Sequence, residues 1–227
     1  MCGLTQGGHR RESARVVLCY GDSNTWGLDP ATQRRFPREF RWPGRLHAAL
    51  GDSWQIIEEG LNGRTTALDS VLLPGRNGLE YLEPCLDSHA PVDVVLVYLG
   101  TSDLADRYAM TATDIARAAG RLATLVAQSA AGVDGRAPRP ILVCPPPLGD
   151  TTWNDDWAGA PGKAVILANR FQAVAARLEV DLIDLGEVTR YSAVDGIHLD
   201  ADGHAAAAKM IERTLRELFP TTAARNG

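Results

Sequence analysis

Ser23 has the sequence setting of a nucleophile. It follows a short apolar run, residues 15–20, and then Gly21 and Asp22, and we predict that it begins a helix. A serine hydroxyl is a weak nucleophile that needs a base to take its proton, a group that orients the base, and donors for the oxyanion. Because the first N–H groups of a helix lack partners inside it, the backbone N–H of Ser23 would be available as one such donor.

The tripeptide Gly-Asp-Ser does not identify a nucleophile by itself, because it occurs twice in this chain. The second copy, residues 51–53, follows a predicted helix and precedes a predicted strand, which is typical of a turn. The context therefore favours Ser23 over Ser53.

His198 is the best candidate for the base. It lies in the segment Asp195-Gly-Ile-His198, after the last predicted strand and just before the last predicted helix. An aspartate three residues before a histidine, with a glycine between them, can fold back so that its carboxylate meets Nδ1 and leaves Nε2 to face the serine. An isolated D-x-x-H would most simply be a surface loop, and its combination with Ser23 favours the catalytic interpretation. The other histidines lie in the N-terminal segment or in predicted helices: His9, His47, His89 and His204.

The elements that must position these residues alternate between strand and helix. Apolar runs followed by turns predict five strands, and helical spacing predicts helices between and after them. The predicted strands are residues 15–20, 54–58, 92–99, 140–144 and 180–184, and the predicted helices are 43–50, 77–89, 113–131, 163–178 and 201–218. This alternation predicts one α/β domain, residues 15–220, with a parallel sheet covered on both faces. Residues 1–14 are predicted to be a disordered extension and 221–227 a tail.

Ligands of open α/β sheets bind beyond the carboxyl ends of the strands. Two of the four segments at those ends combine glycine with small polar residues, and a third directly follows Gly21; glycine allows a ligand close to the backbone. The segments are 22–24, 60–62, 100–103 and 145–147. The irregular stretch 153–162 is either a surface loop or the wall of a pocket.

Composition excludes several other functions. The net charge is -5, and no Lys/Arg run is long enough to follow a phosphate backbone, so we expect no nucleic-acid partner. We expect a cytoplasmic protein without a membrane partner, because there is no secretory signal and no apolar run near the roughly 20 residues of a membrane span.

The four cysteines lack metal-ligand spacing, and Cys19 and Cys144 are predicted to be buried. No G-x-G-x-x-G, P-loop or G-x-S-x-G motif is present.

Five blocks in order resemble the SGNH (GDSL-like) hydrolases, and most closely their bacterial arylesterase/acyltransferase group. They span nearly the whole chain: residues 21–27, 58–66, 99–103, 145–148 and 194–198. The resemblance implies a flavodoxin-like three-layer α/β/α sandwich, here with a five-stranded parallel sheet, and neither a metal nor an organic cofactor. It also implies homo-oligomers with restricted active-site channels, and acyl transfer to alcohols in some relatives.

By the same resemblance, Ser23 is the nucleophile, His198 the general base and Asp195 the residue that orients it. The backbone N–H groups of Ser23 and Gly60 would be oxyanion donors. The third block departs from the family pattern, because Ser102 stands where the family has the asparagine that supplies a third donor. Loss of one such donor typically costs about 10²- to 10³-fold in rate. Three explanations are open: Ser102 donates directly or through a water, Asn24 or Asn62 supplies the donor instead, or the enzyme is weakened. We favour the first two.

Other residues near these blocks have open or structural roles. Asn24, Trp26, Asn62 and Trp153 are candidate substrate-binding residues. Trp26 either walls an acyl pocket or packs in the core, and Arg64 either stabilises the second block or contacts substrate. Asp22 is predicted to cap backbone N–H groups, and Asp103 to hold a loop.

The sequence therefore predicts a serine esterase that hydrolyses short-chain acyl esters of small molecules through an acyl-enzyme. An acyltransferase that passes the acyl group to an alcohol would share every residue. A catalytically silent binding protein on the same fold is the second alternative, which only Ser102 favours.

Overall fold

The computed structural model describes residues 14–70 and 72–220. Their sheet has five parallel strands in the order β2-β1-β3-β4-β5, which is the flavodoxin-like order. All five predicted strands are confirmed. Their bounds are β1 (Arg15–Gly21), β2 (Trp54–Gly60), β3 (Val94–Tyr98), β4 (Arg139–Cys144) and β5 (Asp181–Asp184).

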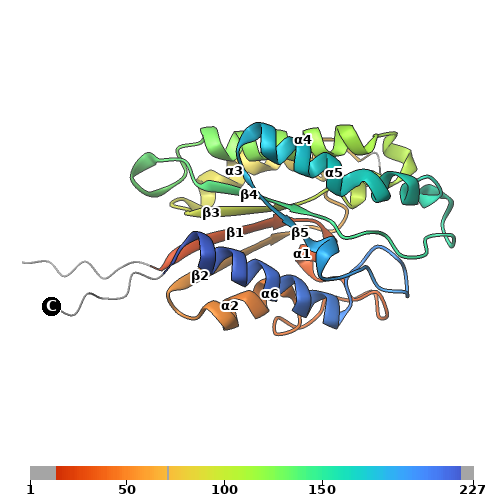
Figure 1. Ribbon diagram of the computed structural model, residues 1–227, viewed down its shortest axis with the longest axis horizontal. Helices are drawn as coiled ribbons and strands as arrows, with labels where there is room; N and C mark the ends of the chain where they lie inside the picture. Colours follow the sequence, from red (N-terminus) through yellow and green to blue (C-terminus); the bar gives the residue numbers. More distant parts are fainter. Residues whose placement is uncertain (1–13, 71, 221–227) are drawn as a thin grey trace, which may run out of the picture.

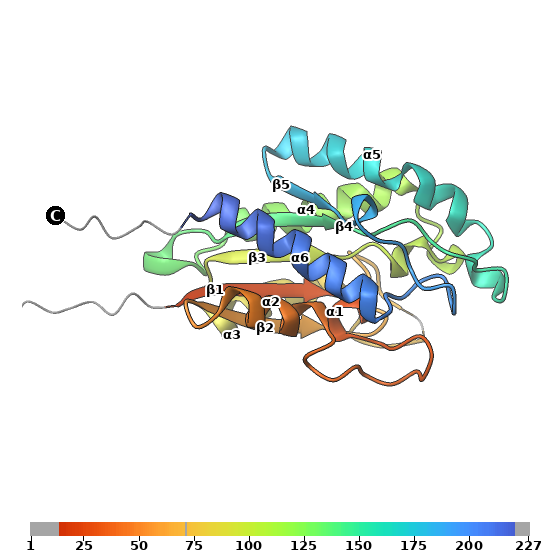
Figure 2. The same cartoon turned by 60° about the horizontal axis from the view of Figure 1, so that its bottom comes forward.

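Helices cover both faces of the sheet, so the predicted three layers are present. Figure 1 shows α4 and α5 above the sheet, and α2 and α6 below it. Turning the molecule brings α2 and α6 to the front, where they lie side by side (Figure 2). The bounds of the main helices are α2 (Trp42–Leu50), α3 (Gly78–His89), α4 (Ala112–Gln128), α5 (Ala160–Leu178) and α6 (Ala201–Leu218).

The apolar runs in the strands follow from burial on both faces. Along β1, Leu18 and Tyr20 pack into the core beneath α3, α4 and α5, whereas Val17 and Cys19 pack into the core beneath α2 and α6. Successive side chains of a strand point to opposite faces, so a strand covered on both sides must be apolar at nearly every position.

One predicted boundary is wrong in an informative way. α5 begins at Ala160, three residues before its predicted start, with Pro161 in its first turn. Proline is favoured there because its fixed φ suits a helix and its missing N–H would lack a helical partner in any case. The stretch 153–162 therefore contains a short 3-10 helix, Asp155–Trp157, and the first turn of α5.

The predicted extension and tail lie outside the described residues, apart from residue 14. Within the ranges that the structure describes, none of the helices combines the length and apolar character required to cross a bilayer.

Candidate active site

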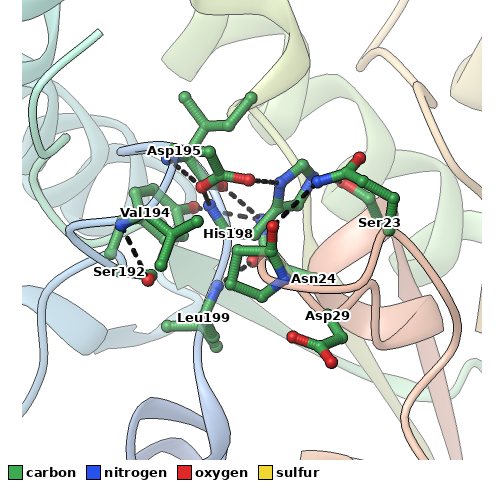
Figure 3. A network of polar contacts seen from close by, with 12 residues as sticks. Ser23, Asn24, Asp29, Ser192, Val194, Asp195, His198 and Leu199 are labelled. Atoms are coloured by element: carbon green, nitrogen blue, oxygen red, sulfur yellow. Dashed lines mark hydrogen bonds and ion pairs between the residues drawn. The ribbon is translucent and has the colours of Figure 1, made fainter.

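Ser23, His198 and Asp195 form one hydrogen-bonded chain. Ser23 is the first residue of the short helix α1 (Ser23–Trp26), and its Oγ lies 2.8 Å from Nε2 of His198. The other ring nitrogen of His198, Nδ1, lies 2.7 Å from Oδ2 of Asp195 (Figure 3). The fold thus brings together the three residues that the sequence singled out, although 175 positions separate Ser23 from His198.

The loop that carries His198 is folded by its own sequence. Oδ1 of Asp195 accepts the backbone N–H groups of Ile197 and His198, each at 3.1 Å, so the carboxylate closes a tight turn. Gly196 within this turn has φ +75°, a conformation that side chains rarely adopt, and a Cβ there would lie 2.4 Å from the carbonyl oxygen of Asp150. Contacts inside the segment 195–198 therefore orient the imidazole of His198.

The charge of Asp195 sets the tautomer of His198. Burial opposes ionisation of Asp195, but hydrogen bonds from the His198 ring and from the N–H groups of Ile197 and His198 outweigh it and lower the pKa of the carboxyl below its usual value of 3.8. An ionised Asp195 accepts a hydrogen bond from the N–H at Nδ1 of His198, which leaves Nε2 unprotonated and free to take the proton of the Ser23 hydroxyl.

A cavity of about 630 Å³ opens at Ser23 and His198. Asn62, Ser102 and Trp153, three of the predicted site residues, line it, and so does Gly63. The wall also includes Asn154 and the buried Trp157, so the stretch 153–162 contributes to a pocket wall rather than only to a surface loop.

Gly60 does not line this cavity, so the structure gives no support to its predicted role as an oxyanion donor. Gly60 still belongs to β2, where the next N–H, that of Leu61, donates to Gly21 O. A Cβ on Gly60 would lie 2.1 Å from the backbone nitrogen of Trp26, so glycine is required there to let α1 pack against the strand. In this segment Asn62 and Gly63 reach the cavity, and Gly63 has φ +73°.

Asn24, a predicted substrate-binding residue, does not line the cavity, and its side chain makes its hydrogen bonds within the protein. It is buried, and its Oδ1 accepts the N–H of Leu199 at 2.9 Å. Its Nδ2 donates to Ile197 O at 3.2 Å and to the Tyr191 hydroxyl at 3.4 Å. Asn24 therefore ties the nucleophile helix to both neighbours of His198 (Figure 3), and its amide is not free to act as an oxyanion donor.

Trp26 does not wall the pocket either. Its ring is half-buried and lies under the guanidinium of Arg35, whose carbon is 5.1 Å from the ring centre. Arg35 Nε also donates to Trp26 O. Trp26 therefore packs against Arg35 rather than in either hydrophobic core, and it does not line the cavity.

Trp153 connects the pocket wall to Asp195. Its side chain is 56% exposed, and its Nε1 donates to Asp195 O at 2.9 Å. Ser102 begins a 3-10 turn after β3, and among the described residues its hydroxyl has no hydrogen-bond partner, so it is free to donate into the cavity. The neighbouring Thr101 hydroxyl is instead 2.6 Å from the hydroxyl of Tyr191.

The structural roles predicted for the two buried aspartates are confirmed. Asp22 caps α1 by accepting the N–H of Asn24, and burial raises the pKa of Asp22 to about 6. Asp103 accepts the N–H and hydroxyl of Thr66, which holds the second block in place, and burial raises its pKa to about 6 as well. Arg64 also has a structural role, because its buried guanidinium donates to Gly21 O and Glu59 O.

Sequence reasoning missed Gly63 and Tyr191. Gly63 had a signal, since it is the second glycine of the Gly-Leu-Asn-Gly block, placed where a turn after the strand needs a positive φ. Tyr191 lies in an irregular segment with no motif, and only the fold brings its hydroxyl to Asn24 and Thr101.

Comparisons with known proteins identify the family of this chain. Residues 19–206 match the GDSL-like Lipase/Acylhydrolase family. An aryl esterase of M. smegmatis is 36% identical, with a TM-score of 0.87 over 91% of this chain and 100% of its own. A carbohydrate acetylesterase from Sinorhizobium meliloti is 36% identical, with a TM-score of 0.87 over 90% of this chain and 100% of its own. No curated protein matches the sequence. The chain therefore belongs to the GDSL-like (SGNH) lipase/acylhydrolase family and is a carboxylic ester hydrolase of that type.

Proposed function

We propose that the protein hydrolyses short-chain acyl esters through an acyl-enzyme on Ser23. The observation that carries the proposal is the chain of contacts from Ser23 Oγ to His198 Nε2 and from His198 Nδ1 to Asp195, three residues that line a cavity of about 630 Å³. A serine, a base and an oriented acid in this geometry are the parts that acyl transfer needs.

In the proposed first step, His198 Nε2 takes the hydroxyl proton as Ser23 Oγ attacks the ester carbonyl. The negative charge that develops on the carbonyl oxygen needs preorganised donors. We assign this role to the backbone N–H groups of Ser23 and Gly63, together with the hydroxyl of Ser102, because each of these residues lines the cavity. His198 then protonates the leaving alcohol, and the acyl group stays on Ser23.

In the second step, a water molecule gives its proton to His198 and attacks the acyl-enzyme, which releases the acid and restores Ser23. The ionised Asp195 stabilises the imidazolium that forms in both steps. The neighbours' names support a small acyl group with a variable alcohol part, since one is an aryl esterase and the other a carbohydrate acetylesterase.

The decisive test is hydrolysis of p-nitrophenyl acetate by the wild type and by Ser23→Ala. The expected loss in kcat is at least about 10³-fold, because removal of a triad nucleophile costs about 10⁶-fold in a serine protease. Ser53→Ala is the matched control, since Ser53 belongs to the second Gly-Asp-Ser copy and is exposed. Equal rates in the wild type and Ser23→Ala would refute the mechanism.

A serine-directed alkyl phosphonate separates an enzyme from a silent binding protein on the same fold. We expect one label per chain on Ser23 in the wild type and none in Ser23→Ala. Failure of the folded wild type to label, together with no hydrolysis, would favour the binding protein.

Acyl transfer to an alcohol uses the same acyl-enzyme and is favoured by one feature of the cavity. Leu28, Trp157 and Ile197 give it apolar walls, which suit an alcohol acceptor better than water alone. Reaction of vinyl acetate with benzyl alcohol in water distinguishes the two acceptors. Benzyl acetate as the main product would show a transferase, and acetate alone would show a hydrolase.

A further inference from the structure

Glu59, Cys85 and His89 form a cluster outside the ester-hydrolysing site. Nε2 of His89 lies 2.8 Å from Oε1 of Glu59, and the carboxylate, thiol and imidazole atoms all lie within 4.8 Å of one another. None of the three residues lines the cavity at Ser23. Their proximity is therefore not explained by ester hydrolysis.

The fold brings these three side chains together from two elements. Cys85 and His89 are four residues apart in α3, so they lie on the same face of that helix. Glu59 lies in β2, the edge strand of the sheet, which pairs only with β1 among the described strands. Cys85 is buried, whereas the side chains of His89 and Glu59 are 28% and 20% exposed, so the cluster is open to solvent on one side.

Sulfur, imidazole nitrogen and carboxylate oxygen are the ligand atoms that zinc prefers. At metal–ligand distances of about 2.0–2.3 Å, the ligand atoms of a tetrahedral zinc ion are about 3.3–3.8 Å apart. The atoms of this cluster span 2.8 to at most 4.8 Å, so small side-chain rotations would place them at such separations. We propose that Glu59, Cys85 and His89 bind one zinc-class divalent cation, with the fourth position open to water.

The charges of the cluster fit a divalent cation. A Cys85 thiolate and a Glu59 carboxylate together would balance its two positive charges. Arg64 is the nearby opposing charge, but its Nη1 donates to the carbonyls of Gly21 and Glu59 and its guanidinium lies 4.2 Å over the ring of Tyr20. Burial, and then the charge of Glu59, raise the pKa of the Cys85 thiol to about 12, so the metal must displace its proton.

Bound metal would join α3 to the edge strand. Glu59 directly precedes Gly60, and the segment that follows carries Asn62 and Gly63 into the cavity. A bound ion would therefore stabilise the end of β2, and it would take no part in ester hydrolysis.

The test is a titration of the metal-free full chain with Co²⁺, which has the ligand preferences of zinc and is visible in absorption spectra. We expect one Co²⁺ per chain and a near-ultraviolet thiolate-to-cobalt charge-transfer band. Cys85→Ala should abolish the band, whereas Cys144→Ala, which removes a buried thiol in β4, should retain it. His89→Gln should weaken binding at least tenfold, whereas His47→Gln, in α2, should not.

Thermal unfolding with Zn²⁺ gives a second readout. At a hundredfold excess over Kd, the wild type should gain roughly 5–10 °C in Tm, and Cys85→Ala and His89→Gln should not. Absence of the charge-transfer band, or an equal Tm shift in wild type and His89→Gln, would overturn the proposal. His89 is partly exposed, so its variant remains informative if Cys85→Ala fails to fold.

Discussion

Substitution of Asn24 tests how the base is held. In Asn24→Ala, the buried Leu199 N–H and Ile197 carbonyl lose the partners that the Asn24 amide supplies at 2.9 and 3.2 Å. These two groups lie on either side of His198. The change therefore leaves Ser23, His198 and Asp195 intact and removes one of the contacts that places the imidazole against the serine.

The expected effects follow from burial and from geometry. An unsatisfied buried polar group costs about 1–3 kcal/mol, so loss of both contacts should lower the free energy of unfolding by about 2–6 kcal/mol. A misplacement of about 1 Å can cost 10²-fold in rate, so kcat should fall by about 10- to 100-fold. KM should change little, because Asn24 does not line the cavity.

The assay is p-nitrophenyl acetate hydrolysis with kcat and KM resolved, alongside urea unfolding. Asn77→Ala is the matched control, because Asn77 is also buried and uses its amide within the protein, accepting Leu79 N–H and donating to Asp69. The control should lose stability but retain kcat. An unchanged kcat in Asn24→Ala would show that the turn closed by Asp195 is sufficient to hold His198 in place. A raised KM with unchanged kcat would show that Asn24 contacts the substrate.

Two further predictions concern the oxyanion site and acid stability. Ser102→Ala should lower kcat on p-nitrophenyl acetate by about 10- to 100-fold, and Ser102→Asn should retain or raise it, because either polar side chain supplies a donor; an unchanged kcat in Ser102→Ala would show that the hydroxyl is not used. For His204, burial and then the charges of Arg45 and Arg41 lower the pKa to about 3. Below about pH 6.5 the unfolded chain therefore binds a proton at His204 that the folded chain does not bind. The contribution of the neutral, buried His204 to the free energy of unfolding is complete above about pH 6.5 and is lost as the pH falls. The difference in urea-unfolding free energy between the wild type and His204→Gln should shrink by about 1.4 kcal/mol per pH unit from about 6.5 towards 3, and a pH-independent difference would refute the shift.

The fold and the Ser-His-Asp geometry could be predicted because their signals are local. A strand covered on both faces must be apolar throughout, so β1 and β3 are visible as continuous runs in the sequence. The turn that orients His198 needs only Asp195 and Gly196, which lie within three residues of it. The meeting of this turn with Ser23 then follows from the carboxyl-end rule for parallel sheets.

The positions of Asn24 and Trp26 could not be predicted, because the direction of each side chain decides its contacts. Asn24 and Trp26 both follow the nucleophile, but the sequence does not show that one amide would be used by the 197–199 segment or that one ring would lie under Arg35. Gly60 ends a strand and stands in a family block, which are the two signals the sequence offers for it. Backbone pairing with β1 continues to Leu61, so the chain reaches the cavity only at Asn62 and Gly63.

The contacts around Asp195 imply that substrate range and catalytic rate are not independent in this protein. Trp153 forms part of the cavity wall, and its Nε1 is bonded to the carbonyl of Asp195. Asp195 in turn fixes both the turn and the ring of His198 through its two carboxylate oxygens. A substitution of Trp153 that reshapes the cavity wall for a different ester therefore also removes a hydrogen bond that holds Asp195. A side chain at 153 without a donor would alter kcat together with KM, whereas changes at Asn62, on the opposite block, would leave the Asp195 turn intact.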